Sequence, residues 1–221
     1  MGSRNYVTVL DDLTLSERAD SKKRAIAAGI ERCAIKNIGD VNSDILGLQS
    51  LPEAEKDARF DLVKAYISTG KWPKSLTLRE LTPALNGDLV VATALDSWLT
   101  AALAVVGTFY TCFQAVVAPQ LAQDKLLVCY GISIDSATVP LPVSRVVFRR
   151  GGAAGNIIAQ YDLEEMEVRQ NVDAYFSEPV VIDPQQAFAI QVRCRTVSGA
   201  GVAEVVHIHN FLFEQSGLIV T

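Results

Sequence analysis

Two histidines and a glutamate near the end of the sequence form the pattern with the clearest chemical potential. Gly201 is followed after five residues by His207, then by His209 and, after four more residues, by Glu214. Alternate residues of a β-strand point to the same face, so the two imidazoles can share a ligand. Imidazole and carboxylate groups bind divalent transition metals. His207, His209 and Glu214 are therefore the candidate metal ligands of this sequence.

This spacing resembles the opening of the first cupin motif, in which two histidines and a glutamate from a β-barrel bind a metal. The resemblance implies a glycine at position 221, where the sequence has Thr221, and a second motif with a third histidine. The sequence contains 2 histidines. We therefore expect no bound metal and no cofactor, and we interpret His207 and His209 as polar rings that face solvent or an interface.

Motifs for nucleophilic catalysis and phosphate binding are absent. There is no Gly-x-Ser-x-Gly segment, and no motif pairs a histidine with a serine or cysteine. Gly151–Gly155 is rich in glycine but lacks the Gly-Lys-Ser/Thr of a phosphate-binding loop. We expect no catalytic residues and interpret the chain as a protein that is not an enzyme.

Two local clusters of charge have simpler explanations than ligand binding. Asp162, Glu164, Glu165 and Glu167 could form a cation site or a patch for a basic partner, but we interpret them as a solvated turn or strand edge. The arginines at positions 145, 149 and 150 form a cluster of the opposite charge. We expect them to form salt bridges rather than a nucleic-acid platform.

Composition narrows the class of protein. The chain has 221 residues, 49% of them hydrophobic and 20% charged, with a net charge of −5 and a pI near 5.1. These values exclude a disordered chain and argue against nucleic acid as the main partner. The 4 cysteines are scattered, so we expect them to be reduced and buried, and the N-terminus shows no secretory leader.

The sequence changes character near Asn86-Gly87, which predicts a helical region at residues 1–87 and a β-sandwich domain at residues 88–221. The first region has 13 Lys/Arg and 12 Asp/Glu, and the second has 7 and 13. A run of helices followed by a run of strands is typical of the α+β class or of two separate domains.

Three helices are expected in the first region. Thr14 and Glu17 form a capping box, after which an apolar stripe runs to Gly39. A second start signal at residues 50–53 precedes a stripe that ends at Gly70, and a short helix is expected at residues 76–81. The first stripe contains Ala25, Ile26, Ile30, Cys33 and Ala34, and the second contains Ala58, Leu62, Val63, Tyr66 and Ile67.

The second region predicts an antiparallel sandwich of jelly-roll type, because short β-rich runs alternate with turn residues. The expected strands cover residues 108–117, 125–134, 143–149, 157–161, 172–176, 180–182, 187–196, 204–213 and 218–221. Residues 97–123 form a run of 27 without a charge, long enough to cross a membrane. Its β-rich segment and acidic flanks favour one or two buried strands instead.

The β region carries about 15% charged residues, against about 25% in ordinary globular chains. We interpret this low charge as a sign that other subunits or the helices cover much of its outer surface.

Residues 107–221 resemble jelly-roll virion proteins of tailed phages, in particular capsid cement or decoration proteins. The segments that carry the resemblance are Leu127–Asp135 and Glu178–Phe188. The resemblance implies a structural protein on the capsid surface, made in the host cytoplasm. Its expected partners are copies of itself and the major capsid or other virion proteins, with no nucleic acid or membrane.

Two other functions stay open at this point. The first is a carbohydrate- or host-binding sandwich of a phage tail or spike, for which exposed aromatic residues are needed, and whose candidates are Trp72 and Trp98. The second is a metal-dependent enzyme built on His207, His209 and Glu214.

Overall fold

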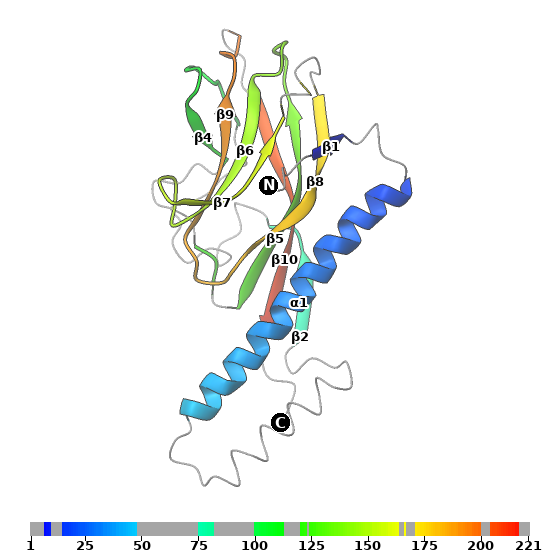
Figure 1. Cartoon of the computed structure of the whole chain (residues 1–221), viewed down its shortest axis with the longest axis vertical. Coiled ribbons are helices and arrows are strands. Elements are labelled where there is room, and N and C mark those ends of the chain that lie inside the picture. Colours follow the sequence, from blue (N-terminus) through cyan, green and yellow to red (C-terminus); the bar gives the residue numbers. More distant parts are fainter. Residues whose placement is uncertain are drawn as a thin grey trace, which may run out of the picture.

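The computed structural model of this chain describes residues 7–9, 15–47, 75–81, 100–112, 120–122, 124–163, 166, 171–199 and 204–216. They form one long helix and two antiparallel β-sheets that pack face to face as a β-sandwich (Figure 1). The expected combination of an N-terminal helix with an antiparallel sandwich is therefore confirmed. The helix expected at residues 50–70 and the strand expected at residues 218–221 lie outside the described residues.

The larger sheet has the strand order β1-β8-β5-β10-β2, and the short strand β3 also pairs with β10. Its strands are β1 (Val7–Val9), β2 (Ser75–Arg79), β3 (Thr100–Ala101), β5 (Lys125–Asp135), β8 (Asn171–Ile182) and β10 (Glu204–Ser216). The smaller sheet has the order β4-β9-β6-β7. Its strands are β4 (Phe109–Thr111), β6 (Val143–Arg150), β7 (Asn156–Asp162) and β9 (Phe188–Cys194).

Strands β2 and β8 differ from the sequence-based expectation. The short helix expected at residues 76–81 is wrong, because Ser75–Arg79 form strand β2 and pair with β10. Leucines at alternate positions in this segment fit the two-residue period of a strand. Residues 172–176 and 180–182 belong to one strand, β8, and Pro179 lies where the ladder between β8 and β5 is irregular. A proline is tolerated at such a bulge.

The helix α1 runs from Leu15 to Gly47, beyond the expected end at Gly39. A glycine inside a helix costs only about 1 kcal/mol relative to alanine, which is not enough to end a long helix. The N-terminal half of α1 lies against β5, β8 and β10, while its C-terminal end extends past the sandwich (Figure 1).

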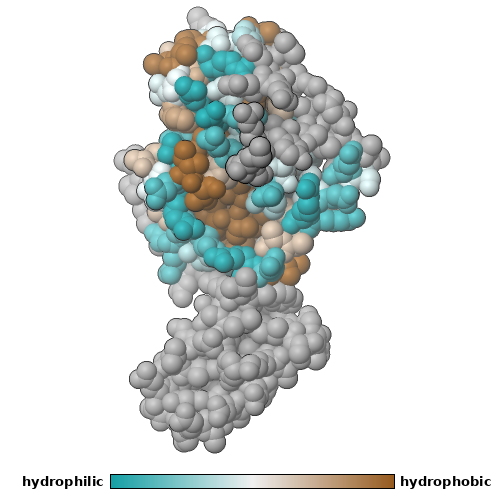
Figure 2. All heavy atoms as spheres, viewed as in Figure 1, coloured by the Kyte–Doolittle hydropathy of each residue, from teal (hydrophilic) through white to brown (hydrophobic). Residues whose placement is uncertain are grey.

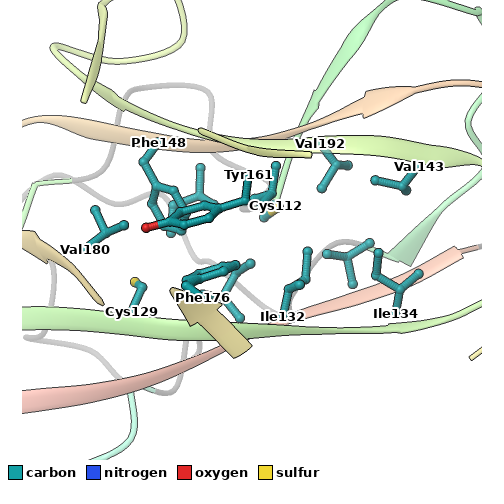
Figure 3. Close-up of a cluster of buried hydrophobic side chains, with 14 of the residues drawn as sticks. Cys112, Cys129, Ile132, Ile134, Val143, Phe148, Tyr161, Phe176, Val180 and Val192 are labelled. Atoms are coloured by element: carbon teal, nitrogen blue, oxygen red, sulfur yellow. The ribbon is translucent and has the colours of Figure 1, made fainter. Parts of the chain in front are cut away.

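The core between the two sheets is built from apolar side chains of both (Figure 3). Phe148 and Tyr161 of the smaller sheet pack against Phe176 of the larger one, with the Tyr161 and Phe176 rings stacked at 4.1 Å between centroids. The Tyr161 hydroxyl donates a 2.6 Å hydrogen bond to the carbonyl of Glu178. The four cysteines are free and buried, as expected, and burial raises the pKa of Cys112 and Cys129.

A second apolar layer fills the space between α1 and the outer face of the larger sheet. Small residues of the helix, Ala25, Gly29 and Cys33, form its buried seam, whereas Ile30 is 36% exposed. The buried face of α1 therefore consists of residues spaced four apart, and it differs from the expected apolar stripe, which included Ile30. The larger sheet supplies Leu126, Val128, Tyr130, Tyr175 and Phe213 to this layer.

Arginines anchor α1 to strand β8 and the turn that follows it. Arg32 contacts both carboxylate oxygens of Asp183 at 2.6 Å, and this hydrogen bonding raises the pKa of Arg32. Nearer the start of the helix, Arg24 donates to the carbonyl of Ser177 at 3.1 Å. These contacts fix the direction in which α1 crosses the sheet.

Within the described residues, no helix is long and apolar enough to cross a membrane. Strands β3 and β4 lie in the uncharged run at residues 97–123, where one or two buried strands were expected, but β4 is half-buried rather than buried.

The close approach of α1 to the sheet predicts a strong effect of substitution at Gly29. A Cβ atom there would overlap the ring of Phe213, so Gly29→Leu would push the helix away from the sheet. We expect the free energy of unfolding to fall by about 1–3 kcal/mol, measured by urea unfolding. Ala27→Leu, at an exposed position of the same helix, is the matched control and should change it by less than about 0.5 kcal/mol. Equal stability of the two variants would contradict this packing.

Candidate functional site

The two histidines lie on the outward face of β10, the face that α1 covers nearer the other end of the strand. His207 pairs with Ser133 of β5 and His209 pairs with Gly131, and the two rings are 5.5 Å apart between centroids. Both side chains are partly exposed, at 32% and 21%. The structure thus places both imidazoles together on one surface.

His209 reaches across β5 to the next strand. Its Nε2 lies 2.6 Å from Oδ1 of Asp173 on β8. Its ring packs beside both Tyr130 and Tyr175, at 5.9 Å from each, and these two tyrosine rings lie 6.1 Å apart. Gly131 makes this crossing possible, because a Cβ atom there would stand 2.9 Å from the His209 ring and 2.6 Å from the carbonyl oxygen of Ala174. The contact therefore ties together three strands of the larger sheet.

His207 pairs with a different carboxylate. Its Nε2 lies 2.9 Å from Oε1 of Glu80, which directly follows β2. Burial lowers the pKa of His207, and the charge of His209 lowers it further, while the carboxylates of Glu80 and Asp173 act in the opposite direction. The net result is a pKa below the ordinary value of 6.5.

The neighbouring Tyr130 shares this environment. Burial and the nearby charges of Tyr175, Glu80 and Asp173 raise the pKa of Tyr130 to about 12. Its phenol therefore stays protonated at neutral pH, and with 9% of its surface exposed it acts as packing for the His209 ring.

Glu214, the third candidate metal ligand, lies far along β10 from the histidines. Its register partner on β5 is Lys125, whereas His209 pairs with Gly131. The Glu214 carboxylate contacts Lys125 Nζ at 3.3 Å and Arg79 Nε at 3.6 Å. Among the described residues, no group of three or more His, Cys, Asp or Glu side chains is arranged to hold a metal ion.

Arg145, Asp162 and Arg149, which the sequence also singled out, are held by local contacts. Arg145 pairs with Asp162 at 2.6 Å, as a salt-bridging role predicts. Arg149 donates to the side chain of Gln191 and to the carbonyl of Gly155, and its guanidinium lies 5.4 Å from the centre of the Phe109 ring. Glu164, Glu165 and Glu167 lie outside the described residues, as do Trp72 and Trp98.

Sequence reasoning missed the partners of the two histidines. Glu80, Asp173, Tyr130 and Tyr175 come from three other segments of the chain, and no local spacing connects them to β10. Gly131 carried a usable signal, since an isolated glycine in a strand often marks a bulge or a close approach.

A second surface lies at the end of the sandwich where β10 begins, uppermost in Figure 1. Three loops there expose four valines, which we call the valine end: Val105, Val106, Val139 and Val197. Figure 2, drawn from the same side, shows hydrophobic residues in brown at this end. Sequence reasoning anticipated surplus apolar surface but did not locate it.

Hydrogen bonds join the three loops of the valine end. Leu103 and Ser198 connect the β3–β4 loop to the β9–β10 loop through two bonds of 2.9 Å. Thr138 of the β5–β6 loop accepts a bond from the amide of Gly199 and donates one of 2.8 Å to the buried carboxylate of Glu204. The valines thus stand on loops that are tied to one another.

No family model matches the chain, and no curated protein matches it.

The lowered pKa of His207 predicts acid sensitivity. As the pH falls below about 6.5, the unfolded chain takes up this proton more readily than the folded chain, so folding is disfavoured. We expect the free energy of unfolding to decrease from about pH 7.5 to about pH 5.5, and to decrease less steeply in His207→Gln. Urea unfolding at a series of pH values measures both slopes, and identical slopes would refute the assignment to His207.

The crossing of His209 over Gly131 predicts coupling between two substitutions. Gly131→Ala should lower the free energy of unfolding by about 1–3 kcal/mol, because the added methyl group meets the carbonyl oxygen of Ala174 and displaces the His209 ring. Asp173→Ala removes the carboxylate that the ring reaches. The double variant should lose less stability than the sum of the single losses, since both changes break the same contact. Strict additivity in a double-mutant cycle would show that Gly131 does not act through His209.

Proposed function

We propose that this chain is a structural protein of a tailed-phage particle, a capsid cement or decoration protein that stabilises the shell through subunit contacts. In this proposal it acts without a catalytic site or cofactor, is made in the host cytoplasm, and ends on the capsid surface. Its partners are copies of itself and the major capsid or another virion protein.

The strand order is the observation that carries the proposal. Among the described strands, β3 to β10 follow one another in the chain and are divided between the two sheets. The larger sheet contains β3, β5, β8 and β10, in the spatial order β3-β10-β5-β8. The smaller sheet has the order β4-β9-β6-β7. This alternation between two four-stranded layers is the pattern of a jelly roll, a fold that viral capsid domains share with lectins and cupins. We propose that the sandwich is a jelly roll on this ground.

The chemistry of the surface favours a structural role over the other users of this fold. The two histidines are engaged by Glu80 and Asp173, and Glu214 lies away from them. Tyr130 and Tyr175 are less than 10% exposed, so they do not offer the flat aromatic surface on which sugars stack. The valine end, by contrast, offers apolar area suited to contact with another protein.

An inventory of the particle tests the proposed function. Purified virions of the phage that encodes this chain should contain it in a fixed ratio to the major capsid protein, measured by quantitative mass spectrometry. Particles depleted of the chain should break at lower temperature than complete particles, because a cement protein adds contacts between shell subunits. Adding back the purified full chain should restore the breakage temperature. Absence from virions would exclude a virion protein, and unchanged particle stability would exclude a cementing role.

A further inference from the structure

The valine end combines high exposure with a well-supported backbone. Val105, Val106 and Val139 are each more than half exposed, and Val197 is 47% exposed. The Tyr110 hydroxyl accepts bonds of 2.9 Å from the amides of Ala104 and Val105, in addition to the hydrogen bonds between the loops. Such a surface loses little conformational entropy when another molecule covers it.

Charge distinguishes this surface from the rest of the molecule. In the described loop residues 102–108, 136–142 and 195–199, the one charged residue is Arg195, whose guanidinium donates to the carbonyl of Leu163 inside the sandwich. The whole chain carries a net charge of −5, so copies of it repel each other over much of their surface. Two charged side chains border these loops, Asp135, which is exposed at the end of β5, and Arg193 of β9, whose guanidinium lies beside Gly107. The loops of the valine end are therefore a place where two copies can meet with few opposing charges.

Symmetry adds a reason for a second copy as the occupant. In a closed homo-oligomer, residues near the axis face the same residues of other copies, so a charged patch there opposes assembly whereas an uncharged apolar patch is complementary to itself. We propose that copies of this chain associate through the valine end, around an axis that passes close to Val106, Val139 and Val197. This inference rests on the proposed function, and it names the surface through which the protein contacts itself.

A competing surface lies on the edge strand β7. Ile157 and Ile158 are exposed there, and an edge strand can pair with another chain through its free backbone groups. Asp162 is the last residue of β7, and Arg150 of β6 pairs with its first residue, so self-contact would bring charged residues together. The observations favour the valine end, and the experiment separates the two surfaces.

The mass of the purified full chain in solution provides the test, measured by light scattering and sedimentation over a range of concentrations. The wild type should form an oligomer, and Val106→Asp, Val139→Asp and Val197→Asp should each weaken association by about tenfold or more, because each places a carboxylate in an apolar contact. Leu78→Asp on β2 is the matched control at an exposed apolar residue elsewhere, and it should leave the oligomer intact. Circular dichroism and thermal unfolding confirm that each variant is folded.

Three outcomes would overturn the inference. A wild type that is monomeric at all concentrations would exclude self-association through the valine end. Dissociation by Ile157→Asp, without dissociation by the valine variants, would assign self-association to β7. Dissociation by Leu78→Asp to the same degree would show a nonspecific effect of charge. Since the purified chain alone is measured, the result is separate from the presence of the protein in virions.

Discussion

Strand β5 is buried on both of its faces, and the arrangement of the whole chain follows from this constraint. Its inward side chains, such as Leu127 and Ile132, enter the core between the sheets, while Leu126 and Val128 pack beneath α1. A strand buried on two sides has no room for unpaired charge. The charged residue at its start, Lys125, is held by Glu214 of the adjacent strand. The helix, the smaller sheet and the neighbouring strands therefore all shield β5 from water.

Close approach to this buried sheet requires glycine at two places. At Gly29 the helix comes so near that the Phe213 ring occupies the position a side chain would take, and at Gly131 the His209 ring does the same above β5. The first contact brings an extra layer of apolar burial, and the second lets a histidine reach Asp173 across the sheet. At both sites glycine loses more conformational freedom on folding than another residue would, and it allows a contact that any larger residue would block.

The long strands were predictable because β-branched and aromatic runs between prolines and glycines mark them locally, and β5, β6 and β10 start where expected. Strand β1, at Val7–Val9, was not expected. The segment now seen as β2 was misjudged, because its partner is β10, far along the chain, and pairing outweighs local propensity. The candidate site also depends on strands that are far apart in the chain. Two histidines on one face could be foreseen from the two-residue period, whereas their pairing with Glu80 and Asp173 depends on the order of strands in the sheet.

Low charge in the β region has more than one cause. Helix α1 covers the outer face of the larger sheet, so the chain itself accounts for part of the missing charge without any partner. Cover by α1 does not explain the low charge of the loops, because loops lie at the surface, where charged side chains are ordinarily favoured. The described loops at the valine end nevertheless hold four exposed valines and one charged residue, Arg195. Composition indicates assembly only after cover by the same chain is subtracted. Among the described residues of the β region, the large apolar side chains that stay exposed lie in these three loops, at Ile157 and Ile158 of β7, and at Val205 of β10.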